Sequence, residues 1–290
     1  MVDSSIQTCS VKMAEDWIRG ERNIMIAGKI AILGVGNLGY SLVEGLQSAG
    51  LADKSQIILA EKNPQRNDHL RSLGYTVSAD NVGAVQAADL VMLVVKPFQI
   101  EAILEEIAPV VEIDRHVLVS TVTGFSAAHM YASLGKTPPL FRVMPNTGIA
   151  IGESISCIAS FNATKEQEQL IATIFSGMGR TLFIPEDMMS AATVLGGCGI
   201  AYALRFIRAA IQGGIEIGFN ADDAKLITAQ MVKGAAELVL SHDTHPEQEI
   251  DKVTTPKGIT ITGLNEMEHA GFSSAIIKGI LASYNKIGEM

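Results

Sequence analysis

The chain has 290 residues, of which 48% are hydrophobic, and its formal net charge is −9. This length allows one large domain or two of ordinary size, each with its own core, so a disordered chain is excluded. No run of Lys or Arg occurs. Because nucleic acids and anionic membranes both require a basic surface, we expect neither as a partner and expect a small-molecule substrate instead.

The three cysteines, Cys9, Cys157 and Cys198, are far apart and form no C-x-x-C pair. This spacing predicts neither a disulfide framework nor a zinc site and favours a reducing, cytoplasmic location. Residues 1–28 contain acidic residues and no long apolar run, so a secretory signal is not expected and a transit peptide is disfavoured. We interpret them as a loosely ordered N-terminal extension, or as the product of a start site upstream of Met25.

Short apolar runs alternate with helical segments from residue 29 to about residue 185. The apolar runs lie at 29–35, 56–61, 90–95 and 116–122, and the helical segments between them at 41–50, 65–74 and 100–111. Continuous apolar strands that alternate with helices are typical of a parallel sheet buried on both faces. We therefore predict a doubly wound, mostly parallel, Rossmann-type α/β domain over residues 29–185.

The remaining residues, 186–290, are predicted to form an all-helical domain. Helical spacing without strand-like alternation occurs at 187–218, 221–241 and 263–287. The first segment is apolar enough to suggest a membrane span. It carries a polar stripe, however, which favours a buried helix packed against other helices; the stripe consists of Arg205, Arg208, Gln212 and Glu216. About a hundred residues cannot bury so much apolar surface alone, so we expect an obligate homodimer, or a larger assembly of dimers.

A dinucleotide-binding motif, GVGNLG, follows the first predicted strand and opens the first predicted helix. Gly34 makes the tight turn, Gly36 lets a pyrophosphate approach the main chain, and Gly39 lets the helix pack on the strand. The alternative is a tight turn with no ligand. The cofactor-binding residues expected here are Gly34, Gly36, Asn37, Leu38 and Gly39.

Glu61 lies 22 residues beyond Gly39, at the end of a predicted strand. An acid at this point accepts hydrogen bonds from the adenosine ribose, which favours NAD. Lys62 and Arg66 follow closely, and a cation here would equally suit the extra phosphate of NADP. Solvated loop charges at Glu61 and Lys62 are a third possibility, so the sequence leaves NADH and NADPH both open.

Two further strand ends are expected at the same edge of the sheet, where doubly wound folds bind ligands. The first is Val95-Lys96-Pro97, and the second leads to Thr123 and Gly124. These residues are candidates for the nicotinamide pocket.

Several motifs resemble those of the pyrroline-5-carboxylate reductase family, in the same order along the chain. They are VVKP at 94–97, TGFS at 123–126, FRVMPNT at 141–147, AY at 201–202, Q-x-x-x-GAA at 230–236, VTTPKGIT at 253–260, GL at 263–264 and E-x-x-G at 268–271. The resemblance implies a dinucleotide-binding domain, a helical domain that dimerises, and active sites where the two meet. It implies reduction of 1-pyrroline-5-carboxylate, a cyclic imino acid, to proline by NADPH or NADH. It places Asn146 near the nicotinamide ribose and Thr255, Gly258, Ile259 and Thr260 near the substrate.

The segment TTPKGIT has properties that suit a carboxylate site. Pro256 restrains it, Gly258 opens it, and the helix that follows presents N–H groups and a positive dipole end. Thr260 is expected as the N-cap of that helix. Its hydroxyl, or a water that it holds, is also a candidate to protonate the ring nitrogen of the substrate, and capping alone is an equal alternative.

The sequence departs from the family pattern at three places. The family's S-G-S-G-P is replaced by GGCGI at 196–200, an acidic position by Arg208, and a glycine-like position of the loop by Lys257. Added positive charge near a carboxylate site predicts tighter substrate binding by Lys257, or a different imino or keto acid. A non-catalytic dinucleotide-binding regulatory protein is a further alternative. His242 and His245 lie in a polar connection with no third ligand, so we predict a surface loop there and no metal.

Overall fold

The computed structural model describes residues 28–242 and 244–288. The extension predicted for residues 1–28 therefore lies outside the described residues, apart from Gly28. The chain divides into two compact units between Glu186 and Asp187. The first unit is an α/β layered structure and the second is helical.

The first unit is built on one sheet of eight strands in the order β3-β2-β1-β4-β5-β6-β7-β8. Neighbouring strands are parallel except for β6 and β7. The mostly parallel, doubly wound sheet predicted from the sequence is confirmed. The strands are β1 (Ile30–Leu33), β2 (Ile57–Ala60), β3 (Thr76–Ser78), β4 (Leu90–Leu93), β5 (Val117–Ser120), β6 (Leu140–Met144), β7 (Ser154–Phe161) and β8 (Gly179–Phe183).

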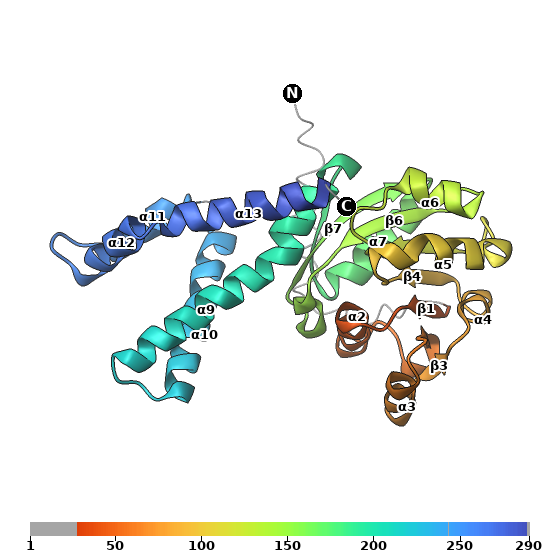
Figure 1. Cartoon of the computed structure of the whole chain (residues 1–290), viewed down its shortest axis with the longest axis horizontal. Coiled ribbons are helices and arrows are strands. Elements are labelled where there is room, and N and C mark those ends of the chain that lie inside the picture. Colours follow the sequence, from red (N-terminus) through yellow and green to blue (C-terminus); the bar gives the residue numbers. More distant parts are fainter. Residues whose placement is uncertain (1–27, 243, 289–290) are drawn as a thin grey trace. The chain divides into compact units, whose positions relative to one another are not determined.

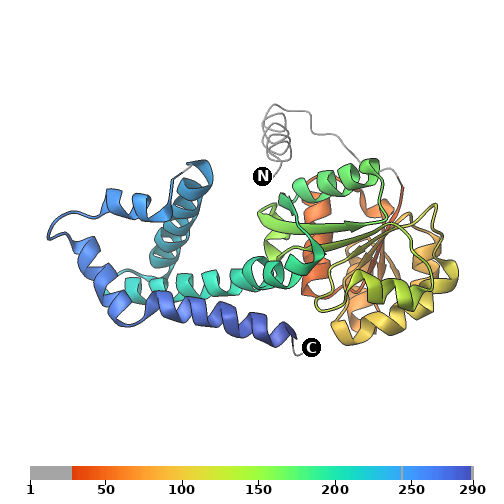
Figure 2. The same ribbon diagram turned by 90° about the horizontal axis from the view of Figure 1, so that it is seen from above.

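Helices cover both faces of this sheet, as Figures 1 and 2 show. One core packs α2 (Asn37–Ser48), α3 (Pro64–Ser72) and α7 (Lys165–Ser176) on one face, and the other core packs α4 (Asn81–Gln86), α5 (Ile100–Ile107) and α6 (Ala127–Leu134) on the opposite face. Because successive strand side chains point to opposite faces, Ile30 and Ile32 enter the first core while Ala31 and Leu33 enter the second. Burial on both faces explains why the strands read as continuous apolar runs.

Several elements of the first unit have no counterpart among the predicted segments. They are β3, α4 and α6, the 3-10 turn η2 (Pro97–Gln99), and everything from β6 to β8, which includes the 3-10 turn η4 (Thr147–Ile151). Three more 3-10 turns overlap predicted segments, namely η1 (Lys54–Gln56), η3 (Ala108–Val110) and η5 (Glu186–Met188). β3 has three residues and β8 is largely exposed, so neither forms a buried apolar run. Arg142, buried on β6, pairs with Glu186 at 2.9 Å, and Glu186 also accepts a hydrogen bond from the N–H of Ala127. That pair ties the last residues of the unit to the sheet.

The second unit consists of helices joined by short connections. They are α8 (Met189–Ala192), the π-helical stretch η6 (Thr193–Cys198), α9 (Gly199–Glu216), α10 (Ala221–Ser241), α11 (Pro246–Val253), α12 (Ile259–His269) and α13 (Phe272–Gly288). The helical spacing at 263–287 corresponds to two helices, because Gly271 adopts a φ of +83° and separates α12 from α13. The connection after Ser241 contains α11, which Pro246 opens and His245 caps.

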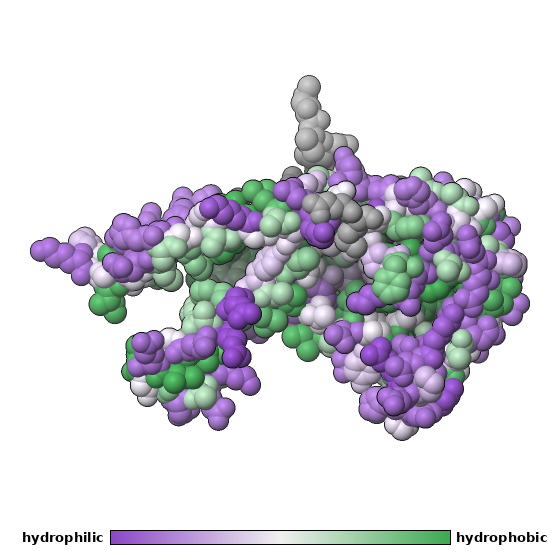
Figure 3. Space-filling model, in the orientation of Figure 1, coloured by the Kyte–Doolittle hydropathy of each residue, from purple (hydrophilic) through white to green (hydrophobic). Residues whose placement is uncertain are grey.

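The helices of the second unit expose many large apolar side chains (Figure 3). They include Leu195, Leu204, Ile215, Leu226, Ile227, Met231, Ile276, Ile277 and Leu281. No residue of α9 is buried within one chain. The apolar pattern of this helix predicted a buried helix, and the single chain does not bury it. Residues 186–216 are also long and apolar enough to cross a membrane, and only 6% of the 18-residue apolar window within them is buried. Core helices of soluble proteins pass the same test, and the polar stripe of α9 favours cover by protein.

Candidate functional site

The first unit contains a cavity of about 660 Å³ at the carboxyl ends of β1, β2, β4 and β5. Eleven of the predicted cofactor residues line it, namely Gly34, Gly36, Asn37, Leu38, Gly39, Glu61, Lys62, Val95, Lys96, Pro97 and Thr123. Gly124 and Asn146 are not among its lining residues. The cavity therefore brings together segments that are far apart in the sequence.

The glycine turn between β1 and α2 leaves no room for side chains at two of its three glycines. Gly34 has a φ of +93°, and a Cβ there would lie 2.5 Å from the carbonyl oxygen of Val94. A Cβ on Gly39 would overlap the carbonyl oxygen of Gly34. Gly36 differs, because a Cβ there would meet no atom within 4 Å. Gly34 and Gly39 are required by the fold itself, whereas Gly36 faces open space on the cavity.

Gly36 is also the N-cap residue of the twelve-residue helix α2. A glycine has no side chain with which to cap, so the first-turn N–H groups of α2 are left to a ligand or solvent. The helix dipole favours an anion at this end. A cavity with a bare main-chain wall at a helix N-terminus fits the pyrophosphate of a dinucleotide.

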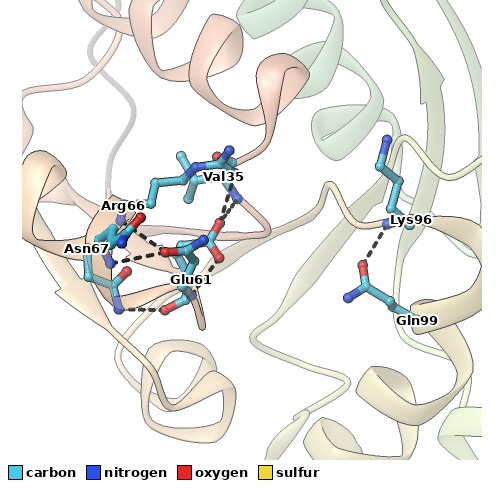
Figure 4. A network of polar contacts seen from close by, with 8 residues as sticks. Val35, Glu61, Arg66, Asn67, Lys96 and Gln99 are labelled. Atoms are coloured by element: carbon cyan, nitrogen blue, oxygen red, sulfur yellow. Dashed lines mark hydrogen bonds and ion pairs between the residues drawn. The ribbon is translucent and has the colours of Figure 1, made fainter.

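Glu61 lies at the end of β2, next to this turn, and its side chain is 14% exposed. Its Oε2 accepts a hydrogen bond from the N–H of Val35 at 3.3 Å (Figure 4). Arg66 Nη1 donates to the carbonyl oxygen of Val35 at 2.9 Å and lies 3.5 Å from Glu61 Oε2. The acid and the cation are thus both fixed against the glycine turn.

Other expected residues lie on the opposite side of the cavity or just beside it. The N–H of Lys96 donates to Gln99 Oε1 at 3.2 Å and so begins the turn η2 (Figure 4). Asn146 caps η4 by accepting a hydrogen bond from the N–H of Gly148 at 2.9 Å, and its neighbour Thr147 lines the cavity.

The lining residues outside the predicted cofactor set are Val35, Ala60, Arg66, Asn81, Val94, Gln99, Ile103, Thr121 and Thr147. Ala60, Gln99 and Thr147 flank predicted positions, which is a signal that was available. Asn81 and Ile103 come from α4 and α5, and only the packing of those helices brings them here.

The candidate substrate loop lies between α11 and α12 in the second unit. The N–H of Gly258 donates to the carbonyl oxygen of Thr255 at 2.9 Å, and Lys257 has a φ of +60°. Gly258 is extended and is the N-cap of α12, so the expectation that Thr260 is the N-cap is wrong. The chain leaves the left-handed region at Lys257, and helical dihedrals therefore begin at Ile259. Thr260 is the second residue of the helix, and the side chain of Ile259 is 92% exposed.

The GGCGI stretch at 196–200 spans the end of η6 and the start of α9. Thr193 begins η6 and donates from Oγ1 to the carbonyl oxygen of Met189 at 2.8 Å. Short π-helical stretches often occur at functional sites. Cys198 is half-buried, with a free thiol.

The polar connection that contains His242 is organised around a carboxylate. Glu249 Oε1 accepts hydrogen bonds from Lys252 Nζ and Thr244 Oγ1, both at 2.6 Å, and lies 3.6 Å from His242 Nδ1. The hydrogen bond from Lys252 and that from Thr244 lower the pKa of Glu249 to about 2. His245 caps α11 through its ring. Within residues 28–242 and 244–288, no three His, Cys, Asp or Glu side chains form a group suited to a metal.

Two family models match the chain. Residues 186–290 match the model described as pyrroline-5-carboxylate reductase dimerisation. Residues 29–124 match that described as NADP oxidoreductase, coenzyme F420-dependent.

Known relatives match both units together. Pyrroline-5-carboxylate reductase 2 of Dictyostelium discoideum is 41% identical over 273 residues, which cover 89% of this chain and 91% of that protein. Pyrroline-5-carboxylate reductase 1 of the same organism is also 41% identical, over 90% of this chain, but the match spans only 49% of its length. The crystal structure of pyrroline carboxylate reductase from Plasmodium falciparum with NADP bound has 26% identity and a TM-score of 0.82, and the match covers 92% of this chain and 98% of that one.

Two glycines of the turn, Gly36 and Gly39, are expected to respond differently to the same added methyl group. Gly36→Ala should leave the thermal unfolding temperature unchanged, because its Cβ meets no atom within 4 Å, yet weaken dinucleotide binding about tenfold or more by keeping the pyrophosphate from the main chain. Gly39→Ala should lower the unfolding temperature, because the methyl group overlaps the Gly34 carbonyl oxygen. Calorimetric titration and thermal unfolding of both variants measure this, and equal binding by Gly36→Ala and the unmodified protein would contradict it.

Proposed function

The chain belongs to the pyrroline-5-carboxylate reductase family, and from that premise we propose that it reduces 1-pyrroline-5-carboxylate to proline with NADH or NADPH. The observation that carries the proposal is the 41% sequence identity with pyrroline-5-carboxylate reductase 1 of Dictyostelium discoideum over 90% of the chain. That share of the chain includes both the glycine turn and the 255–260 loop. We propose further that it acts in the cytoplasm as a homodimer or a larger homo-oligomer, with residues 29–185 as the dinucleotide-binding domain and residues 186–290 as the substrate and dimerisation domain.

The first unit is proposed to hold the dinucleotide. The pyrophosphate lies against Gly36 and the N-terminus of α2, where main-chain N–H groups and the helix dipole stabilise its charge. Pro97 and Thr123 line the same cavity and are proposed to contact the nicotinamide end, together with Gly124 and Asn146, the chain neighbours of the lining residues Thr123 and Thr147. When bound, the nicotinamide ring supplies the hydride, and the chain contributes binding and orientation.

The loop before α12 is proposed to hold the substrate carboxylate. The N–H groups of Ile259 and Thr260 belong to the first turn of α12, where no intrahelical acceptor exists. Lys257 adds a positive charge beside them. Its φ of +60° costs a non-glycine residue about 1–2 kcal/mol relative to a right-handed conformation. A strained lysine retained at a position suited to glycine supports a role in binding the anion.

Thr260 is proposed to supply, directly or through a water that it holds, the proton for the ring nitrogen of the imine. Its side chain does not act as an N-cap, since Gly258 occupies that position. The hydroxyl is therefore available for the substrate. Protonation makes the imine carbon more electrophilic, which hydride transfer requires.

A second candidate is reduction of another small imino or keto acid. The changed GGCGI stretch, Arg208 and Lys257 favour this alternative, because they alter charge and polarity in segments that the family uses. A non-catalytic dinucleotide-binding homologue is the third, and it predicts binding without turnover.

The substrate proposal predicts oxidation of NADH or NADPH when the purified protein receives pyrroline-5-carboxylate, with proline as the product. The measurement is loss of the nicotinamide absorbance together with chromatographic detection of proline. A panel of other cyclic imines and 2-keto acids separates the alternatives. Dinucleotide binding with no turnover of any member of the panel supports the non-catalytic homologue and overturns the proposal.

Replacing Lys257 by glycine is expected to have opposite effects on stability and on catalysis. Lys257→Gly relieves the positive φ, so the free energy of unfolding should rise by up to about 1 kcal/mol. Loss of the charge should raise KM for the imino acid about tenfold. Lys257→Gln is the matched control, which should raise KM equally without stabilising the chain. An unchanged KM in both variants would exclude Lys257 from substrate binding.

Thr260→Val is expected to lower kcat on the order of 100-fold, with little change in KM, because it removes a proton donor and keeps the side-chain shape. Thr262→Val on the same helix is the control. Thr262 Oγ1 donates to the Gly258 carbonyl oxygen at 3.2 Å, so its loss should affect stability rather than kcat. Steady-state kinetics of the two variants decide the matter, and equal losses in both would mean that Thr260 serves only the helix.

A further inference from the structure

The choice between NADH and NADPH depends on what surrounds the adenosine ribose, and the structure places four charged side chains there. Glu61 and Lys62 line the cavity at the end of β2, and Arg66 lines it from α3. Glu106, on α5, is the fourth and pairs with Lys62. The charges of these residues sum to zero, and their pairing decides which of them meets a ligand.

The Glu61 carboxylate is oriented by two main-chain donors. Its Oε2 accepts from the N–H of Val35 at 3.3 Å, and its Oε1 accepts from the N–H of Asn63 at 2.9 Å. Both contacts fix the orientation of the carboxylate. The carboxylate is consequently held at the rim of the glycine turn, where an acid at the end of the second strand meets the ribose hydroxyls of NAD.

Each neighbouring cation is engaged by a carboxylate. Arg66 Nη1 lies 3.5 Å from Glu61 Oε2 and donates to the Val35 carbonyl oxygen at 2.9 Å. Lys62 Nζ lies 3.5 Å from Glu106 Oε2, and that oxygen also accepts a hydrogen bond from Asn81 Nδ2 at 2.9 Å. Figure 4 shows Arg66 and Glu61 turned toward Val35 on one side of the site. Each cation already lies beside a carboxylate, which reduces the positive charge that it offers to an added phosphate.

We propose that this chain selects NADH over NADPH, with Glu61 as the specificity-determining residue and Arg66 as the residue that positions it. The proposal rests on the assignment of the cavity to a dinucleotide. An ionised carboxylate only accepts hydrogen bonds, and the 2′- and 3′-hydroxyls of NADH donate them. The 2′-phosphate of NADPH carries a charge of about −2 and would lie beside the Glu61 carboxylate. Repulsion between the phosphate and the Glu61 carboxylate would weaken the binding of NADPH and leave that of NADH unaffected.

The alternative arrangement has a specific structural cost. A 2′-phosphate bound by Arg66 would compete for its guanidinium with Glu61 and the Val35 carbonyl oxygen, both of which Arg66 contacts through Nη1. The Glu61 carboxylate would then face the phosphate without its cation. The same four residues therefore favour NADH in the arrangement observed and disfavour the rearrangement that NADPH requires.

The test is the ratio of dissociation constants for NADH and NADPH, measured by calorimetric titration of the full chain without an imino acid. The unmodified protein should bind NADH on the order of 100-fold more tightly than NADPH. Glu61→Ser should weaken NADH and strengthen NADPH, so that the ratio falls to about one. Glu61→Gln, which keeps the side-chain shape and removes the charge, should shift the ratio in the same direction if Glu61→Ser folds poorly.

Two further variants separate the roles. Glu105→Ser changes the net charge equally on an exposed part of α5, so it should leave the ratio unchanged. Arg66→Gln should weaken NADH severalfold without improving NADPH, because it releases Glu61 from its position. A selective loss of NADPH binding in Arg66→Gln, or tighter binding of NADPH by the unmodified protein, overturns the inference.

Because no imino acid is present in this measurement, the substrate proposal can fail while the NADH preference stands. Absence of binding by both dinucleotides would remove the premise and the inference together. Binding of NADH without turnover of pyrroline-5-carboxylate would overturn only the substrate proposal.

Discussion

The cavity depends on one close approach between main-chain segments, where the first turn of α2 passes over the end of β1. Gly39 lies against the carbonyl oxygen of Gly34, and Gly34 lies against that of Val94. A side chain at either position would force the segments apart. The N–H of Gly34 can then donate to the carbonyl oxygen of Ala60 at 2.9 Å, and the N–H of Val94 to that of Leu33 at 2.8 Å. These two hydrogen bonds align the ends of β1, β2 and β4. The alignment brings a helix N-terminus, an acid and the Lys96 turn to one edge of the sheet.

Backbone shape and local charge have separate roles at this edge. A glycine turn of this kind suits a pyrophosphate, which NADH and NADPH share, so in the proposed site it contributes nothing to the choice between them. We propose that the choice depends on the residues beyond β2, where Glu61 and Arg66 both contact Val35 of the turn itself. A change of cofactor preference is therefore possible without any change in the fold.

The second unit is stabilised differently from the first. Its helices bury few side chains within one chain and expose a large apolar area, whereas the first unit has two continuous cores. Apolar surface of this extent requires cover, and the match of residues 186–290 to a dimerisation family indicates that a second copy supplies it. The exposed polar stripe of α9, including Arg205 and Arg208, must then be accommodated in the assembly, where charged groups need partners.

The sequence alone determined the fold class, the glycine turn and the family, because each rests on residues close together or on motifs kept in order. Continuous apolar runs identified β1, β2, β4 and β5, since strands buried on both faces cannot alternate. The glycine spacing and the acid 22 residues later predicted two groups of residues that the structure brings to one cavity, and the pairing of the charges there stayed open.

Tertiary structure decided what depends on residues distant in the chain or on a single dihedral angle. Asn81 and Ile103 reach the cavity through helix packing, which leaves no local signal. The N-cap of α12 is Gly258 rather than the predicted Thr260, because Lys257 adopts a left-handed conformation. Side-chain identity does not predict that conformation. The partners of Arg66 and Lys62 likewise come from other elements, Val35 and Glu106. A charge in the sequence has a sign, but its effect on a ligand depends on which opposite charge the folded chain places beside it.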